Sequence, residues 1–206
     1  MDPVKKKFNE WAENGKAESM EIEHGKNVLK FLQKINFDKE FSFLDIGCGN
    51  GWVVRYISQI ENCKTAIGID VSDKMIKRAK KSISKNNQDF FCSEIETWNT
   101  RKKFDFIFAM ESIYYVESIP IALKKIFQLL KPGGMFCCGT DFYSENKDTA
   151  KWQNMMKIRM HLLSENQWKK LFAEQGFKVK IKHIKDLKDR KKWKRELGTL
   201  FIIGEK

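Results

Sequence analysis

The length and composition of the chain indicate one folded domain. It has 206 residues, of which 42% are hydrophobic and 13% aromatic. This length suits a single domain with a full core, and the composition excludes a disordered chain. No apolar run approaches the roughly 20 residues that a membrane helix needs. Residues 1–7 are charged and lead into no apolar stretch, unlike a secretory signal. We therefore expect a cytoplasmic protein with no membrane partner.

The charge is strongly positive and unevenly distributed. The formal net charge is +12, from 39 Lys and Arg against 27 Asp and Glu. Much of the excess lies in residues 178–195. A basic surface of this kind can bind nucleic acid or an acidic substrate, or can simply be a solvated lysine-rich face.

The five cysteines contain no C-x-x-C pair, which favours buried free thiols over disulfides or zinc. The three histidines are too dispersed along the chain to predict a metal site.

The hydrophobic pattern predicts helices first and then alternating strands and helices. Residues 4–36 are expected to be mostly helical, because apolar residues recur there at helical spacing. Short apolar runs, which predict strands, follow at 41–46, 65–69, 89–92, 104–110, 135–140 and 197–204. Residues 177–184 alternate apolar and charged side chains, which predicts a strand with one solvated face. Amphipathic stretches predict helices at 52–60, 72–83, 119–130 and 164–176. Residues 141–163 mix aromatic and charged side chains and are expected to be irregular.

This alternation predicts an α/β fold. Strands separated by helices of this length form βαβ units, which build a mostly parallel sheet covered on both faces. No helix is predicted after the last strand, which allows the sheet to finish in an antiparallel hairpin. The chain shows no internal repeat and no linker, so residues 1–206 are expected to form a single domain.

A glycine-rich loop follows the first predicted strand. It reads Asp45-Ile46-Gly47-Cys48-Gly49-Asn50-Gly51 and leads into a helix. Glycine allows a tight turn and a close approach of the backbone to a ligand, and the N–H groups at the start of a helix favour an anion. The second predicted strand ends at Asp70, whose carboxylate can accept both hydroxyl hydrogens of a ribose. These features predict a nucleotide-like ligand, and the glycines alone also fit a dinucleotide.

The spacing of the loop narrows this prediction. Dinucleotide sites usually read G-x-G-x-x-G, whereas Gly47, Gly49 and Gly51 form G-x-G-x-G with Asp45 two residues before them. The acidic residue favours a ligand that carries an ammonium group and lacks a pyrophosphate. A nicotinamide-dependent dehydrogenase is therefore disfavoured.

Five segments in chain order carry a family resemblance. They are 43–51 (FLDIGCGNG), 68–75 (GIDVSDKM), 91–96 (FCSEIE), 104–112 (FDFIFAMES) and 130–134 (LKPGG). As a set they resemble class I S-adenosylmethionine-dependent methyltransferases, of the small-molecule type similar to the ubiquinone-biosynthesis methyltransferases. The resemblance covers residues 41–140. It implies a Rossmann-like, doubly wound, three-layer α/β/α domain with seven strands, the last of them antiparallel. It also implies an N-terminal helical cap at 1–36 and an acceptor-side loop or lid at 141–163.

The resemblance also implies site residues. The cofactor would be S-adenosylmethionine, with S-adenosylhomocysteine as product, and ten positions are expected to contact it: Asp45, Gly47, Cys48, Gly49, Asp70, Val71, Met75, Glu94, Ile95 and Met110. The family favours aspartate at the position of Glu94. Methyl transfer from a sulfonium is an in-line displacement, so the protein mainly aligns the acceptor, excludes water and in some cases removes a proton.

Three residues are candidates for a catalytic role. Glu111 and Tyr115 follow the fourth predicted strand, and His161 lies in the expected lid. The alternatives are a cofactor or backbone contact for Glu111, core packing for Tyr115 and a structural role for His161. No metal is expected.

The sequence does not identify the methyl acceptor. A small-molecule acceptor is favoured, because the chain lacks an added recognition domain. An RNA or protein acceptor that uses the basic residues 178–195 is the alternative, and a noncatalytic binding protein is a third possibility. The Asn/Asp-Pro-Pro-aromatic motif of enzymes that methylate exocyclic base nitrogens is missing after the fourth predicted strand, where residues 110–115 read MESIYY.

Overall fold

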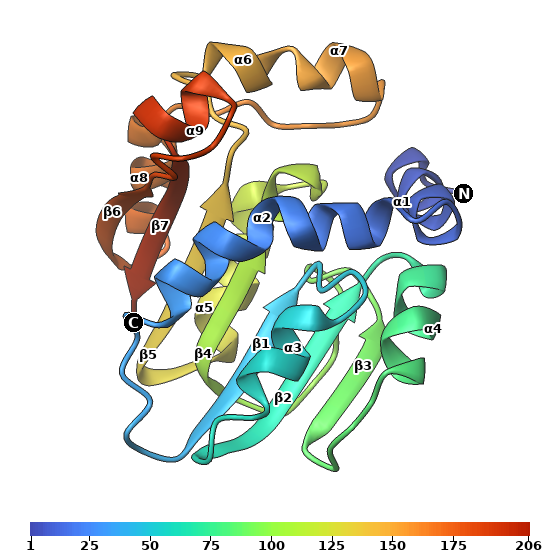
Figure 1. The fold of residues 1–206 in the computed structure, drawn as a ribbon. Helices are drawn as coiled ribbons and strands as arrows, with labels where there is room; N and C mark the ends of the chain where they lie inside the picture. Colours follow the sequence, from blue (N-terminus) through green and yellow to red (C-terminus); the bar gives the residue numbers. More distant parts are fainter.

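A single seven-stranded sheet organises the molecule (Figure 1). The computed structural model describes residues 1–206. The strands are β1 (Phe41–Ile46), β2 (Cys63–Asp70), β3 (Gln88–Cys92), β4 (Phe104–Met110), β5 (Leu130–Thr140), β6 (Lys178–Ile184) and β7 (Thr199–Glu205). Their order in the sheet is β3-β2-β1-β4-β5-β7-β6. Strands β1 to β5 are parallel, and β7 runs antiparallel to both β5 and β6. The predicted Rossmann-like fold with an antiparallel last strand is confirmed.

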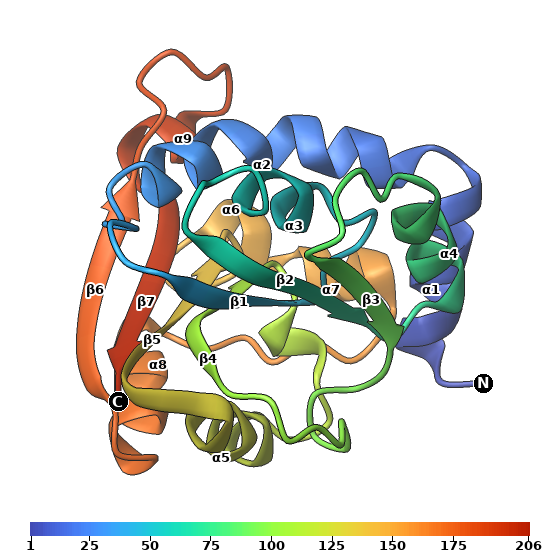
Figure 2. The same ribbon diagram turned by 90° about the horizontal axis from the view of Figure 1, so that it is seen from below.

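Helices cover both faces of the sheet. They are α1 (Pro3–Glu13), α2 (Lys16–Leu32), α3 (Trp52–Ile57), α4 (Asp73–Lys81), α5 (Ile119–Leu129), α6 (Lys147–Ala150), α7 (Trp152–Met156), α8 (Glu165–Glu174) and α9 (Lys192–Glu196), with a 3-10 turn η1 at Ile113–Tyr115. Figure 2 shows α2, α3 and α4 on one side of the sheet and α5 and α8 on the other. None of these helices combines the length and the apolar character needed to cross a membrane.

Each face of the sheet packs its own hydrophobic core. One core joins residues of α2, α3 and α4 to the sheet, and the other joins α5 and α8 to the opposite face. Cys137 and Cys138 show the alternation of a strand, because Cys137 belongs to the first core and Cys138 to the second. All five cysteines are free, as expected, but Cys92 is exposed because β3 lies at the edge of the sheet.

Several predicted element bounds need correction. Helix α3 ends at Ile57 and α4 at Lys81, so Ile83 lies beyond the helix with 44% of its surface exposed. Strand β5 begins at Leu130, earlier than predicted, because Leu130 pairs with Phe104. The segment 141–163, expected to be irregular, contains the short helices α6 and α7. The basic connection before β7 contains α9.

The topology places a site at the carboxyl ends of β1 and β4. Strand β1 pairs with β2 on one side and with β4 on the other, so the chain connections diverge between β1 and β4. In open parallel sheets, ligands bind in the crevice outside the strand ends at such a point. The glycine loop follows β1 directly, and α1 and α2 lie beside this edge in Figure 1.

Candidate active site

A cavity of about 650 Å³ lies at the carboxyl ends of β1, β2 and β4. Its size is typical of a site for a small molecule or cofactor. Residues of α1, α2 and α7 complete its wall. All ten positions expected to contact a cofactor line this cavity: Asp45, Gly47, Cys48, Gly49, Asp70, Val71, Met75, Glu94, Ile95 and Met110. The structure therefore brings together residues that the sequence spreads over 66 positions.

The glycine loop is held by backbone contacts at its base. The N–H groups of Gly47 and Cys48 both donate to the carbonyl of Ile69, at 2.8 and 3.0 Å. Gly47 has a φ of +72°, and an added Cβ would lie 2.3 Å from the Cβ of Ser112. Gly49, with a φ of +53°, would have no atom within 4 Å of an added Cβ. Of these two glycines, Gly47 is the one required by close packing as well as by its backbone conformation.

Asp70 is oriented by two backbone donors. Its Oδ2 accepts from the N–H of Gly49 at 2.9 Å, and its Oδ1 accepts from the N–H of Ser72 at 2.8 Å. Burial raises the pKa of Asp70 to about 6, and the two hydrogen bonds oppose this rise. Each oxygen keeps a lone pair, so the carboxylate can accept further hydrogens from a diol in the cavity.

Asp45 is a buried carboxylate that faces the cavity without a hydrogen-bond donor from the protein. Only 3% of its surface is exposed. Burial and then the charge of Asp70 raise its pKa well above the usual range. Isolated buried carboxylates are costly unless a cation or donor pairs with them. A bound ammonium group would supply both, so the residues present fit the cofactor that the sequence resemblance implies.

The wall beyond Asp70 is largely apolar. Val71, Met75 and Ile95 line it, and Met75 and Ile95 are buried. Such a surface suits a flat base ring. Glu94 lines the same region from an exposed position.

Helix α1 is attached to the segment that follows Asp70 at the rim of the cavity. The hydroxyl of Ser72 donates to Asn9 Oδ1 at 2.6 Å, and Asn9 Nδ2 donates to Asp73 Oδ1 at 3.3 Å. The ring of Phe8 packs edge-on against Tyr115, with 5.1 Å between centroids. Helix α1 therefore contacts both the loop after β2 and the turn after β4.

Glu111 lies at the centre of a polar cluster at the end of β4. It has a φ of +52°, which is unusual for a residue other than glycine. The hydroxyl of Tyr114 donates to Glu111 Oε2 at 2.6 Å, and the N–H of Asp141 donates to Oε1. Burial and the nearby charge of Asp141 raise the pKa of Glu111. Glu111 and Tyr115, two of the three predicted catalytic candidates, both line the cavity.

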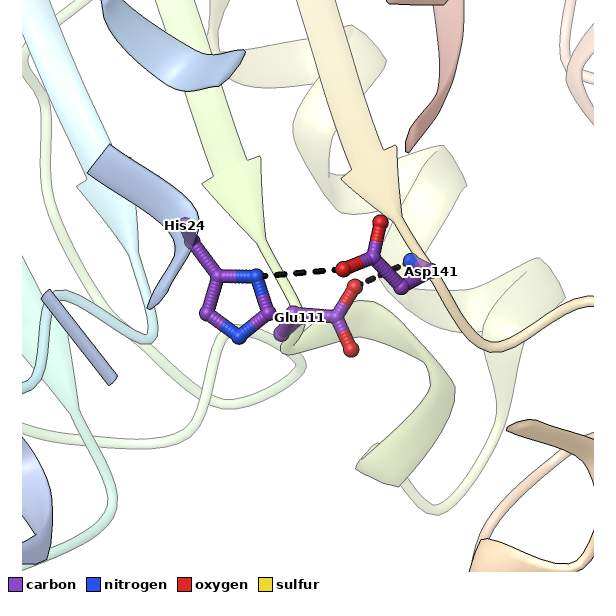
Figure 3. Close-up of side chains that lie close together, drawn as sticks. All are labelled: His24, Glu111 and Asp141. Carbon is purple, nitrogen blue, oxygen red and sulfur yellow. Dashed lines mark hydrogen bonds and ion pairs between the residues drawn. The ribbon is translucent and has the colours of Figure 1, made fainter. Parts of the chain in front are cut away.

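His24 joins this cluster from helix α2 (Figure 3). Its Nδ1 lies 3.3 Å from Asp141 Oδ2, and Asp141 follows β5. Ligand atoms of His24, Glu111 and Asp141 lie within 4.8 Å of one another, so the three residues are close enough to hold a metal ion. Sequence reasoning placed His24 in the helical cap and Asp141 in the lid, and it did not predict their contact.

His161, the third catalytic candidate, is not among the residues that line the cavity. Its Nε2 lies 2.9 Å from the carbonyl of Val116, and its N–H donates to the carbonyl of Tyr114 at 2.9 Å. Both contacts hold the chain after α7 against the turn η1. His161 is engaged in positioning backbone and does not reach the cavity.

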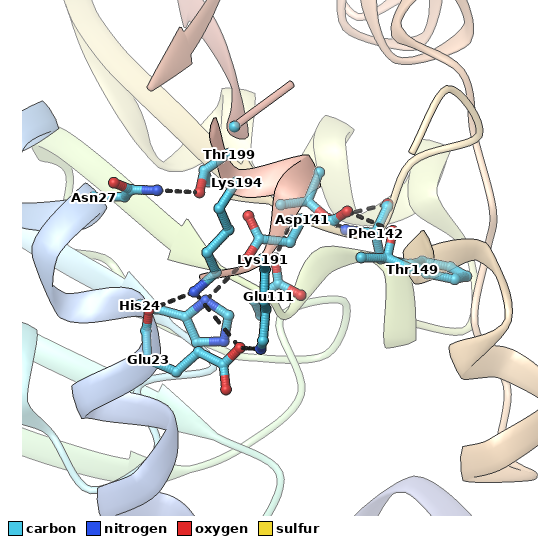
Figure 4. A network of polar contacts seen from close by, with 12 residues as sticks. Glu23, His24, Asn27, Glu111, Asp141, Phe142, Thr149, Lys191, Lys194 and Thr199 are labelled. Atoms are coloured by element: carbon cyan, nitrogen blue, oxygen red, sulfur yellow. Dashed lines mark hydrogen bonds and ion pairs between the residues drawn. The ribbon is translucent and has the colours of Figure 1, made fainter. Parts of the chain in front are cut away.

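The basic connection near α9 is bound to helix α2 (Figure 4). Lys191 and Lys194 both pair with Glu23, and Lys194 Nζ also donates to the carbonyl of Glu23 at 3.0 Å. Lys26 pairs with Asp186 at 2.5 Å. Part of the positive charge in residues 178–195 therefore holds the helix that carries His24, which the sequence pattern did not indicate.

Comparison with known proteins agrees with this arrangement. A family model described as "Methyltransferase domain" matches residues 13–180. A malonyl-[acyl-carrier protein] O-methyltransferase of Priestia megaterium is 25% identical over 138 residues, which are 66% of this chain and 50% of that protein. A ubiquinone biosynthesis O-methyltransferase of Bradyrhizobium diazoefficiens is 33% identical over 99 residues, which are 47% of this chain and 38% of that protein.

A solved structure shares the whole fold. In the complex between the Haloferax volcanii Trm112 methyltransferase activator and the putative methyltransferase, one chain superposes with a TM-score of 0.90. It is 23% identical, and the match covers 96% of both chains. The chain spans half or less of the length of the two sequence relatives named above. The family model nevertheless covers most of its residues, and the chain belongs to the methyltransferase-domain family.

Proposed function

We propose that this protein is an S-adenosylmethionine-dependent methyltransferase that acts on a small-molecule acceptor. The observation that carries the proposal is the pair of buried carboxylates, Asp45 and Asp70, at the rim of one cavity beside the glycine loop. Asp45, which has no hydrogen-bond donor from the protein, matches the ammonium group of that cofactor. Asp70, which can accept hydrogen bonds from a diol, matches its ribose.

The residues of the cavity would divide the binding of the cofactor. Asp45 would pair with the ammonium group, and the loop backbone at Gly47 and Gly49 would pass beside the amino-acid portion. Asp70 would accept the ribose hydroxyls, and the apolar wall at Met75 and Ile95 would pack on the base. When bound, S-adenosylmethionine supplies a methyl group already activated on a sulfonium, so the protein must chiefly align the acceptor and exclude water.

Two observations favour a small acceptor. The two sequence relatives named above are a malonyl-[acyl-carrier protein] O-methyltransferase and a ubiquinone biosynthesis O-methyltransferase. In this chain, Tyr114, Tyr115 and Trp152 line the cavity on the side of Glu111. A wall of this kind suits an apolar or aromatic molecule better than a polyanion.

An RNA or protein acceptor is the second candidate. The observation in its favour is the formal charge of +12, with exposed lysines along the edge strand β6. The ion pairs of Lys191 and Lys194 with Glu23 account for part of this charge within the fold. The small-molecule acceptor is therefore the better supported of the two.

Titration calorimetry with S-adenosylhomocysteine tests the cofactor site. We expect the affinity to increase as the pH rises through about 6, because Asp70 accepts ribose hydroxyls best when ionised and its pKa lies near 6. Asp70→Asn should weaken binding about 10- to 100-fold at pH 8, the usual loss for a hydrogen bond to a charged group. Affinity that stays constant from pH 5 to pH 8 and is unchanged in this variant would contradict the proposed site.

A methyl-transfer screen with labelled cofactor tests the acceptor. The panel should hold phenols, amines, thiols, total RNA and a protein extract. We expect label in a small molecule. Label found only in RNA or only in protein would favour the second candidate.

A further inference from the structure

A histidine and an aspartate are paired at the wall of the cavity (Figure 3). His24 comes from α2, and Asp141 follows the carboxyl end of β5. Their side chains are 8% and 1% exposed, and His24 Nδ1 lies 3.3 Å from Asp141 Oδ2. His24 lines the cavity, whereas Asp141 lies behind it. The carboxylate therefore faces one side of the imidazole, and the cavity lies on another.

The second ring nitrogen of His24 is free of the protein. Its Nδ1 faces Asp141, and no protein group pairs with Nε2. Neutral imidazole carries its proton on the nitrogen that faces a carboxylate, which leaves the lone pair on the other nitrogen. Nε2 is then able to accept a proton from a molecule in the cavity.

Asp141 has few other contacts that would explain its burial. Neither of its carboxylate oxygens makes a hydrogen bond of good geometry, so the contact with His24 at 3.3 Å is its main polar interaction. A buried carboxylate without partners is costly. A protonated His24 would shorten and strengthen this contact, as charge-assisted hydrogen bonds do. The pair is thus suited to stabilise an imidazolium formed during a reaction.

We propose that His24 is a general base that removes the proton from a hydroxyl acceptor, and that Asp141 is the positioning residue that orients it. This inference rests on the proposed methyltransferase function and names its acceptor class. The hydroxyl proton moves to His24 Nε2 as the acceptor oxygen forms its bond to the methyl carbon. The sulfur–carbon bond breaks with its electron pair remaining on sulfur. The products are a methyl ether and S-adenosylhomocysteine, and His24 then releases its proton to solvent.

The surroundings of His24 determine the pH at which it can act. Burial lowers the pKa of His24, but Asp141, Glu111 and Glu23 together raise it above the ordinary value. The neutral, active form therefore accumulates only as the pH rises above the usual histidine range. Removing the charge of Asp141 should lower this pKa and extend activity to lower pH.

A metal ion bound by His24, Glu111 and Asp141 is a competing explanation. Both carboxylate oxygens of Glu111 already accept hydrogen bonds, from Tyr114 and from the backbone of Asp141. Each of these oxygens keeps one lone pair, as in Asp70, so the hydrogen bonds alone do not decide between the two roles, and the chelator test below distinguishes them. The free Nε2 and the position of Asp141 behind the ring favour the acid–base role.

Initial rates with two phenols of different acidity test the proposal. The probes are 3,4-dihydroxybenzoate and 4-nitrocatechol, whose hydroxyl ionises near neutral pH. With the first probe we expect His24→Gln to lower kcat about 100-fold or more, the usual contribution of a general base. With 4-nitrocatechol the loss should be much smaller, because this acceptor needs little help to ionise. A purely structural role for His24 predicts equal losses with both probes.

Asp141 needs a test that separates positioning from folding. Asp141→Asn should lower kcat and shift the acidic limb of the pH–rate profile to lower pH. Asp141→Glu keeps the charge and should have a kcat between those of Asp141→Asn and the wild type. His183→Gln is the matched control, because His183 pairs with Glu165 at 3.0 Å outside the cavity. This control should leave the profile unchanged.

Several results would overturn the inference. They are equal losses with both phenols in His24→Gln, an unshifted profile in Asp141→Asn, a loss of wild-type activity with a chelator that Mn²⁺ restores, or no transfer to either phenol. Binding of S-adenosylhomocysteine, measured on the same samples, separates failure of the His24 proposal from failure of the proposed methyltransferase function. If the cofactor binds and the inference fails, the methyltransferase proposal remains, and if the cofactor does not bind, both fail.

Discussion

Gly47 shows how one residue couples two strands at the site. It follows β1, and its N–H donates to the carbonyl of Ile69 in β2. Its α-carbon faces Ser112, whose hydroxyl donates to the carbonyl of Ile46 at 2.7 Å. The absence of a side chain at this position lets the turn after β4 close on the loop. The loop conformation and the placement of Glu111 beside it are therefore linked.

Substitution of this glycine should be costly, and Gly49 provides the comparison. Gly47→Ala imposes a left-handed backbone on alanine and a contact of 2.3 Å with Ser112 Cβ, whereas Gly49→Ala imposes only the first. We expect Gly47→Ala to lower the free energy of unfolding by about 1–3 kcal/mol more than Gly49→Ala, since overpacking adds that amount. Urea denaturation of both variants gives the difference. Equal stabilities would contradict the close packing at Gly47.

At the scale of elements, helix α2 is a link between the two halves of the sheet. It carries His24 towards the cavity, and it is fastened by Glu23 to Lys191 and Lys194 in the connection before β7 (Figure 4). The side chain of Lys194 is only 5% exposed, and it pairs with Glu23 at 3.5 Å and with Asp189 at 3.9 Å. The position of His24 thus depends on contacts made by a segment far along the chain.

Neutralising Glu23 should loosen this attachment. Glu23→Gln removes the nearer of the two carboxylates that pair with the buried Lys194, and we expect a loss of about 1.5–3 kcal/mol in unfolding free energy, typical of hydrogen bonds to charged groups. Glu40→Gln is the control, because the Glu40–Lys64 pair lies at the surface and exposed pairs contribute little. Denaturation and hydrogen exchange of α2 measure both effects. Equal changes in the two variants would show that the attachment adds no stability.

The elements also show what the sequence could predict. Strands β1 and β4 were predicted to the residue, because each is an apolar run bounded by polar residues or glycine. The cofactor-side residues were predicted together because they follow strands whose order in the sheet the resemblance supplies. His24 and Asp141 were not paired, since helical spacing shows which face a residue occupies but not what lies across from it. The short helix α9 was missed because its lysines matched the pattern of a solvated connection.

At the scale of the whole molecule, the positive charge has both internal and external uses. The excess of 12 positive charges should attract any polyanion at low ionic strength. Lys178 and Lys180 project from the exposed edge strand β6, while Lys191 and Lys194 are paired with Glu23. The electrostatic surface is therefore less basic near α9 than the sequence suggests.

Binding to mixed RNA should accordingly be weak and non-specific. We expect a dissociation constant above about 1 µM at physiological salt and a steep loss of affinity as salt increases. The double variant Lys178→Glu, Lys180→Glu should weaken this binding further without changing methyl transfer to a small acceptor. Filter binding across a salt series measures it. Sub-micromolar affinity at physiological salt would instead favour an RNA substrate.

The attachment of α2 has a consequence for the order in which the protein folds. Asn27 donates to the hydroxyl of Thr199 at 2.9 Å, across 172 residues of sequence. During synthesis the helix leaves the ribosome long before its partner in β7 exists. Contacts between such distant segments form late, because closing a long loop is entropically costly. Helix α2, which carries His24, is thus expected to dock only after β7 has paired with the sheet. In a nascent chain the cavity would therefore lack this wall.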